Sequence, residues 1–189
     1  IWSCGTFQTP IPLAEKPARR WNKMAATRRR SLRSIMPSRC ASIRSTGAAV
    51  RLITDGDVAG VIHTTNPDET GVDIYMGTGG APEGVLAAAA LRCIGGQMQC
   101  RLILDSEEKR ERAHKMGVSD PRMIYGIEDM VKGDCLFAAT GVTTGSLLTG
   151  VKFRKDNVIE TETVVMRSVT GTVRVIKAEH RELQKFYLD

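Results

Sequence analysis

Glu83 lies in a glycine-rich stretch, residues 77–84 (GTGGAPEG), between an apolar run at 72–76 and an alanine-rich run at 85–92. Glycines allow a sharp turn and a close approach to a ligand, and Pro82 suits the first turn of a helix. The free N–H groups and the dipole of that turn favour an anion, but a carboxylate beside a phosphate repels it unless a cation lies between them. The stretch therefore indicates a site for a phosphate and a divalent metal ion. A tight strand-to-helix turn, in which Glu83 only stabilises the helix dipole, explains the same residues equally well.

Asp55 and Asp57 flank Gly56 directly after a second apolar run, residues 49–53. Their carboxylates can accept hydrogen bonds from sugar hydroxyls, or bind a metal ion as hard oxygen ligands. A plain turn, with Asp57 capping the next helix, is the competing interpretation. In an open α/β sheet, ligands bind at the carboxyl ends of the strands, where this segment and the glycine-rich stretch both fall. A third segment there, residues 140–145, we interpret as a structural turn.

Alternating apolar and helical runs predict the elements that position these residues. We expect strands within 49–53, 72–76, 98–104 and 135–140, and helices after Asp57, over 85–92 and over 106–116, the last with Ser106 as its N-cap. This order predicts an α/β fold with a mostly parallel sheet covered on both faces. Two β-rich runs, 161–167 and 172–177, predict an antiparallel hairpin near the carboxyl end.

The net charge of +6 is unevenly distributed, which bears on possible partners. Residues 1–44 hold ten Lys or Arg and one acid, whereas residues 45–189 hold seventeen bases and twenty acids. The body of the chain therefore shows no footprint of nucleic-acid binding. No apolar run approaches ~18 residues, so we expect no membrane span. The five cysteines lack the spacing of a zinc site, and reduced cytoplasmic thiols are expected.

Residues 79–84 also loosely imitate a dinucleotide-binding fingerprint, with Asp105 ending the next strand. Against this, Pro82 stiffens the loop, and Glu83 places a negative charge where a pyrophosphate would bind. An NAD(P)-binding, Rossmann-like domain is therefore the alternative. The phosphatase site requires the Glu83 side chain to face the same cavity as the aspartates, whereas a dinucleotide site requires Asp105 about one ribose away from the glycine loop.

Four segments resemble the class II (GlpX-type) fructose-1,6-bisphosphatases, in the order of that family's motifs. They are VRLITDGDVA at 50–59, MGTGGAPEGV at 76–85, FAATGVT at 137–143 and TETVVMR at 161–167. The resemblance runs from about residue 43 to about residue 180. It implies hydrolysis of the 1-phosphate of fructose 1,6-bisphosphate to fructose 6-phosphate in cytoplasmic gluconeogenesis, and also of sedoheptulose 1,7-bisphosphate. It implies the layered sheet-and-helix fold of the inositol-monophosphatase-like sugar phosphatases.

The resemblance also implies a set of site residues and partners. Glu83 would bind Mg²⁺ or Mn²⁺, which polarises a phosphoryl oxygen and activates a water. The residues that would contact the sugar bisphosphate are Asp55, Gly56, Asp57 and Gly80; no catalytic residue is assigned. At full length, a homo-oligomer (dimer or tetramer) is implied, with neither a membrane nor a nucleic-acid partner.

Two departures from the family pattern lead us to expect an incomplete fold. The family's longer amino-terminal half, which supplies most carboxylate metal ligands and a lysine near the attacking water, is not visible in this sequence. A Lys-Pro-Arg-His-like phosphate-binding segment normally precedes Asp-Gly-Asp closely, whereas the partial match KPAR at 16–19 lies too far upstream. We therefore expect the 189-residue chain to be inactive on its own.

Residues 1–42 show no sustained strand or helix period, and the chain begins with Ile1 rather than methionine. A transit peptide, a basic arm and a sequence that is not native protein, such as a frame-shifted translation, all explain this segment. We favour the third. The predicted organisation is a basic, poorly ordered or non-native segment at 1–42, followed by the α/β substrate-binding part of a sugar bisphosphatase at 43–189.

Overall fold

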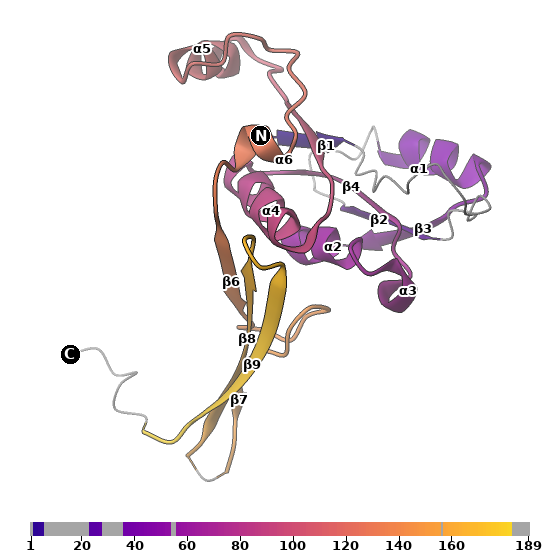
Figure 1. The fold of residues 1–189 in the computed structure, drawn as a ribbon. Helices are drawn as coiled ribbons and strands as arrows, with labels where there is room; N and C mark the ends of the chain where they lie inside the picture. Colours follow the sequence, from indigo (N-terminus) through magenta and orange to yellow (C-terminus); the bar gives the residue numbers. More distant parts are fainter. Residues whose placement is uncertain (1, 6–22, 28–35, 54–55, 156, 183–189) are drawn as a thin grey trace.

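The computed structural model describes residues 2–5, 23–27, 36–53, 56–155 and 157–182, with side chains from Cys40 onward. The described chain has a mixed α/β fold with two sheets (Figure 1). Its helices are α1 (Met36–Ser45), α2 (Asp57–His63), α3 (Pro67–Thr70), α4 (Ala81–Ile94), α5 (Glu107–Lys115) and α6 (Ile127–Met130). Within these ranges, every helix is too short or too polar to span a bilayer.

The first sheet has the strand order β3-β2-β4-β1-β5. Its strands are β1 (Trp2–Gly5), β2 (Lys23–Thr27), β3 (Ala49–Ile53), β4 (Ile74–Gly79) and β5 (Gln99–Leu102). The pairs β2–β3 and β2–β4 are parallel, whereas β1 runs antiparallel to both β4 and β5. The expected strands at 49–53, 72–76 and 98–104 are therefore present, within two or three residues of their predicted ends.

The expectation of a mostly parallel sheet is wrong for the described strands. The segment that contributes β1 and β2 has no strand period in its sequence, yet β1 lies between β4 and β5 with the opposite direction. Local periodicity predicts that a strand exists, but not which neighbour it pairs with, so this insertion was not foreseen. The division of the chain at residue 42, and the non-native origin of residues 1–42, stay predictions.

The second sheet is antiparallel throughout its described pairs. It consists of β6 (Leu136–Thr140), β7 (Lys152–Phe153), β8 (Ile159–Arg167) and β9 (Thr172–His180). The strand β8 pairs with each of the other three. The predicted hairpin is confirmed, because β8 and β9 pair from Ile159↔His180 to Arg167↔Thr172. A short turn at 168–171 can join only antiparallel neighbours, and Gly171 adopts φ 57° there.

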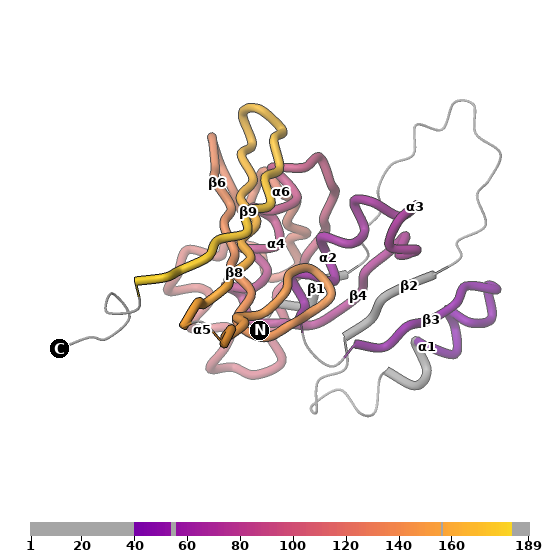
Figure 2. Tube along the Cα trace, turned by 90° about the horizontal axis from the view of Figure 1, so that it is seen from below, coloured from indigo at the N-terminus to yellow at the C-terminus, as the bar shows by residue number. Residues whose placement is uncertain are grey.

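The core is built around α4, which packs with α2 between the two sheets (Figure 2). Ala88 and Leu91 belong to the apolar cluster on the side of the first sheet, whereas Ala90 and Cys93 belong to the cluster formed with β6 and β8. The alanines leave little side-chain bulk, which lets neighbouring elements approach α4 closely. Both faces of this helix are therefore buried.

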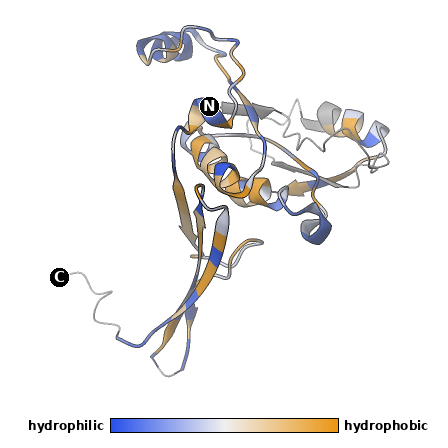
Figure 3. Cartoon of the chain, viewed as in Figure 1, coloured by the Kyte–Doolittle hydropathy of each residue, from blue (hydrophilic) through white to orange (hydrophobic). Residues whose placement is uncertain are grey.

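The predicted helix at 106–116 is confirmed as α5, and the Ser106 side chain accepts a hydrogen bond from the Lys109 N–H at 3.3 Å. The sequence of α5 (EEKRERAHK) is mostly hydrophilic (Figure 3). This helix projects away from the two sheets in Figure 1. It contributes no residue to the two apolar clusters.

Candidate active site

The glycine-rich stretch joins β4 to α4, as the sequence predicts. Gly80 is the N-cap in an extended conformation, and Pro82 lies in the first turn. The Gly80 N–H donates a 2.8 Å hydrogen bond to Oε2 of Glu83. This contact is one half of a capping box; Gly80 has no side chain to make the other half. Glu83 therefore does cap the helix, as one of the two sequence interpretations holds.

Asp57 is the first residue of α2, in the turn where a carboxylate complements the helix dipole. The prediction that Asp57 caps this helix is wrong in detail, because the N-cap residue is Gly56 and α2 has no side-chain cap hydrogen bond. Gly56 adopts φ 74°, a left-handed conformation that glycine accepts without strain. This left-handed residue directly precedes the first turn of α2.

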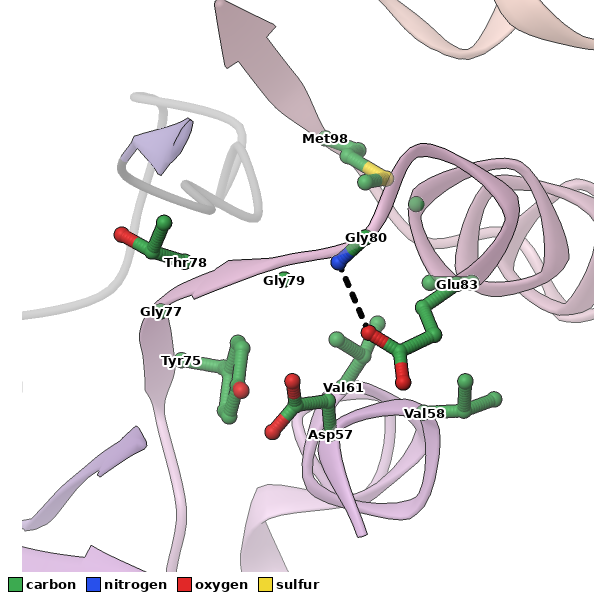
Figure 4. A pocket seen from close by; sticks show the side chains of 12 residues that line it. Asp57, Val58, Val61, Tyr75, Gly77, Thr78, Gly79, Gly80, Glu83 and Met98 are labelled. Carbon is green, nitrogen blue, oxygen red and sulfur yellow. Dashed lines mark hydrogen bonds between the residues drawn. The ribbon is translucent and has the colours of Figure 1, made fainter. Parts of the chain in front are cut away.

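The side chains of Asp57 and Glu83 meet at Gly79. A Cβ atom placed on Gly79 would lie 3.0 Å from Glu83 Oε2 and 3.1 Å from Asp57 Oδ2. Figure 4 shows the two carboxylates facing the same space, one from α2 and one from α4. A glycine at position 79 is therefore what allows both oxygens to come this close to β4.

A cavity of about 30 Å³ lies at this meeting point, with Asp57, Gly79, Gly80 and Glu83 among its lining residues. Its deeper wall is apolar and buried, and consists of Val61, Tyr75, Ala87 and Met98. An apolar wall behind two carboxylates lowers the local polarity, which strengthens the attraction of those carboxylates for a cation.

Tyr75 also lines the cavity, although no motif in the sequence marks it as a site residue. Its side chain is buried and lines the cavity, and a Cβ on Gly77 would lie only 2.5 Å from its hydroxyl oxygen. The available signal is the two-residue period of β4, which places residues 75, 77 and 79 on one face. That period points Tyr75 toward the same side as the glycines.

The structure brings together part of the predicted set. Asp57, Gly80 and Glu83 line the cavity; Gly56 adjoins it through Asp57. Asp55 lies outside the described residues. No group of three or more His, Cys, Asp or Glu side chains within the described ranges could hold a metal ion. The two converging carboxylates have the chemistry of Mg²⁺ or Mn²⁺ ligands, and the other positions of a six-coordinate ion would need oxygens from water, substrate or further residues.

The described residues do not form the arrangement that a dinucleotide site would need. Asp105 does not line the cavity. Its carboxylate instead pairs with the Lys109 ammonium one turn along α5, and this hydrogen bond lowers the pKa of Asp105. The Glu83 carboxylate, whose charge would repel a pyrophosphate, lies at this loop and accepts from the Gly80 N–H. The loop therefore directs a carboxylate toward the cavity.

The third candidate segment, 140–145, lies apart from the cavity and matches its interpretation as a structural turn. A Cβ on Gly141 would lie 2.3 Å from the Thr149 carbonyl oxygen. The Gly141 N–H donates to the Glu162 carbonyl at 3.0 Å. Close backbone packing is therefore sufficient to account for glycine at this position.

Comparison with protein families agrees with the motifs around this cavity. Residues 33–180 match the family of bacterial fructose-1,6-bisphosphatases, glpX-encoded. The chain belongs to this family. The match covers α2, β4 and α4, and hence both converging carboxylates.

Individual relatives agree with the family match. The D-fructose 1,6-bisphosphatase class 2/sedoheptulose 1,7-bisphosphatase of Synechococcus sp. (strain JA-3-3Ab) is 41% identical over 151 residues, covering 73% of this chain and 43% of the relative. The protein of the same description from Microcystis aeruginosa (strain NIES-843 / IAM M-2473) is 40% identical with the same coverage. The chain thus spans less than half the length of these relatives.

Proposed function

We propose that this chain is the substrate-binding portion of a metal-dependent sugar bisphosphatase. The reaction is hydrolysis of the 1-phosphate of fructose 1,6-bisphosphate to fructose 6-phosphate and phosphate, with sedoheptulose 1,7-bisphosphate as a second substrate. The observation that carries the proposal is the convergence of Asp57 and Glu83 on Gly79, in a chain that belongs to this family. Two carboxylates from different helices meet here at the end of a strand, where α/β proteins bind their ligands.

In this proposal the two carboxylates have different roles. Glu83 binds Mg²⁺ or Mn²⁺, and Asp57 accepts hydrogen bonds from sugar hydroxyls together with Asp55. The backbone at Gly56 and Gly80 completes the substrate contacts. When bound, the metal ion supplies Lewis acidity toward a phosphoryl oxygen. Glu83 also holds the Gly80 N–H at 2.8 Å, so the metal ligand and the substrate-binding backbone are linked by one hydrogen bond.

The described residues supply only part of the site that this reaction needs. Mg²⁺ prefers six oxygen ligands in near-octahedral geometry, whereas this proposal assigns it one protein ligand, Glu83, among the described residues. We propose that the remaining ligands come from the part of the relatives that this chain does not span. The complete cytoplasmic enzyme would have the layered inositol-monophosphatase-like fold and would act as a dimer or tetramer.

A chimeric enzyme tests the proposed function directly. The aligned region of the Synechococcus relative is replaced by the matching residues of this chain, which share 41% identity with it. We expect phosphate release from fructose 1,6-bisphosphate that requires Mg²⁺ or Mn²⁺. Glu83→Gln in the chimera keeps an oxygen that accepts from the Gly80 N–H, yet removes the ligand charge. Turnover should therefore fall by about a hundredfold or more while the protein stays folded.

Glu108→Gln is the matched control for this chimera, because Glu108 is exposed on α5, away from the cavity. It should leave turnover and metal dependence unchanged. A folded chimera that releases phosphate equally well with and without the Glu83→Gln substitution would remove Glu83 from the metal site. A chimera that is folded, binds divalent metal and still releases no phosphate would contradict the proposed reaction.

A further inference from the structure

Two cysteines from separate elements meet on the side of α4 that faces the second sheet. Cys93 lies in the last turn of α4, and Cys135 directly precedes β6. Their sulfur atoms are 3.6 Å apart, although the residues are 42 positions apart in the chain. The Cys93 side chain is buried in the apolar cluster with Phe137 and Met166, whereas Cys135 is half-buried.

Hydrogen bonds hold both thiols across this contact. The Cys135 thiol donates to the Ala89 carbonyl at 3.7 Å, and the Cys93 thiol lies 3.8 Å from the Cys135 carbonyl. The backbone of Cys135 is anchored by Ser168, whose hydroxyl accepts from the Cys135 N–H at 2.8 Å. The Ser168 N–H returns a 3.0 Å bond to the Cys135 carbonyl. The two sulfurs therefore face each other from well-anchored backbones.

A disulfide bond requires the sulfurs to approach to about 2.05 Å, which is about 1.5 Å closer than they are. Rotation of the two side chains about their Cα–Cβ bonds is the movement that would bring the sulfurs together. Cys100, by contrast, lies in the other apolar cluster, against the first sheet. The fold thus selects one pair of thiols from among the described cysteines.

We propose that Cys93 and Cys135 form a reversible disulfide bond, and that this pair is a modification site for a low-molecular-weight disulfide such as glutathione disulfide. The half-buried Cys135 thiolate attacks the glutathione disulfide, which forms a mixed disulfide and releases one glutathione thiolate. The Cys93 thiolate then attacks the Cys135 sulfur and releases the second glutathione. The two cysteines lose two electrons and two protons, and one glutathione disulfide becomes two glutathione molecules. This modification is independent of the proposed phosphatase function.

The environment of Cys93 sets the order and the pH dependence of these steps. Burial, together with the contact to Cys135, raises the pKa of the Cys93 thiol to about 11. Only the thiolate is nucleophilic, so Cys93 is a slow first attacker at neutral pH but can resolve a mixed disulfide held beside it. Below that pKa, the rate of closure should rise about tenfold for each unit by which the pH is increased.

The bond would join the end of α4 to the start of β6. It would close a loop between residues 93 and 135 and so reduce the conformational freedom of the unfolded chain. We expect the oxidised protein to melt several degrees above the reduced protein. Dithiothreitol should reverse the difference.

Peptide mapping tests the proposal. The folded chain is incubated with glutathione disulfide, the remaining thiols are blocked with N-ethylmaleimide, and the protein is digested with trypsin. Cleavage after Arg92, Arg101, Lys132 and Lys152 gives the peptides 93–101 and 133–152. We expect these two peptides joined, at their summed mass less two hydrogens. The same treatment in urea should distribute disulfides over many pairs of the five cysteines.

Peptide 93–101 also contains Cys100, so variants decide which thiol has reacted. Cys100→Ser should keep the cross-link, whereas Cys93→Ser should lose it and leave Cys135 as a stable mixed disulfide. If Cys93→Ser does not fold, judged by circular dichroism, Cys93→Ala and the pH dependence of closure in the wild-type chain replace it. A wild-type chain that accumulates only the mixed disulfide would overturn the proposal. A cross-link that survives in a folded Cys93 variant would do so too.

Discussion

Asp57 Oδ2 and Glu83 Oε2 lie 3.1 and 3.0 Å from the point that a Cβ atom on Gly79 would occupy. The two residues lie in the first turns of different helices, α2 and α4, and are far apart in the sequence. The absence of a side chain on one strand residue therefore sets how closely these carboxylates can approach β4 and each other. This relationship makes Gly79 the most direct place to perturb the site without removing a charge.

Gly79→Ala should separate the two carboxylates by a few tenths of an ångström. Because both contacts are with the ends of side chains that can shift, the free energy of unfolding should fall by about 1 kcal/mol or less. In the chimeric enzyme, metal-dependent turnover should fall about tenfold or more, since a small misplacement of reacting groups is costly. Phosphate release and urea denaturation measure the two effects.

Gly145→Ala is the matched control, because a Cβ at Gly145 meets nothing within 4 Å. It should leave turnover unchanged. Equal losses of turnover in the Gly79 and Gly145 variants would show that the convergence at Gly79 is not what matters.

The 189-residue chain alone should release no phosphate from fructose 1,6-bisphosphate with Mg²⁺ or Mn²⁺. The described residues hold no group of three potential metal ligands, and Glu83 alone would leave most of the six positions of the ion to water, so we expect the ion to bind too weakly for turnover. The measurement is phosphate release by the purified chain, repeated after addition of the remainder of the Synechococcus relative as a second polypeptide. Metal-dependent turnover by the chain alone, abolished by Glu83→Ala, would mean that other residues complete the site.

Glu162 should make the second sheet sensitive to acid. Its carboxylate accepts a 2.6 Å hydrogen bond from the Thr149 N–H and lies 3.7 Å from the Lys177 ammonium. The Thr149 hydrogen bond and the nearby lysines lower its pKa from the usual 4.5. A carboxyl whose pKa is lower in the folded state contributes stability above pH 4.5, and this contribution disappears as the pH falls through the folded-state pKa.

Thermal melts from neutral pH down to about pH 3 check this sign. The wild-type chain should melt above the Glu162→Gln variant at neutral pH, and the gap should narrow in acid. Glu179→Gln is the control, because Glu179 is more than half exposed and pairs with Arg181 near the end of β9. A gap that widens as the pH falls would contradict the assignment.

Leu91→Ala should be among the most destabilising substitutions in the chain. Leu91 is fully buried on α4 against the first sheet, and one of its methyl carbons lies 2.4 Å from the position of a Cβ on Gly96. Truncating such a side chain costs about 2–5 kcal/mol. Leu86→Ala on the same helix is the control, because Leu86 is 51% exposed. Urea denaturation should separate the two variants clearly; similar costs would indicate that α4 is not packed against the first sheet through Leu91.

Local periodicity was enough to predict most of the elements that position the site. The apolar runs before Asp57 and Glu83 are strands β3 and β4, and the runs after them are helices α2 and α4, as expected. Turn chemistry also predicted Ser106 as the N-cap of α5 correctly. These predictions succeed because each rests on a pattern that is complete within ten or fifteen residues of sequence.

Long-range relationships could not be predicted in the same way. The position of β1 between β4 and β5, and the 3.6 Å contact between Cys93 and Cys135, depend on how distant elements pack. The placement of Gly56 rather than Asp57 as the N-cap depends on a left-handed backbone angle that the sequence permits but does not require. The sequence did not predict that Glu83 and Asp57 share a cavity; the phosphatase hypothesis only required it.

The burial of α4 on both faces has a consequence for how the protein exchanges its amide hydrogens. Ala88 and Leu91 face one apolar cluster, and Ala90 and Cys93 face the other. Neither sheet can separate from this helix without exposing apolar surface to water. The amides of residues 87–93 should therefore exchange with deuterium only through complete unfolding, at the slowest rate in the chain. The exposed, charged helix α5, which belongs to neither cluster, should exchange through local opening long before them.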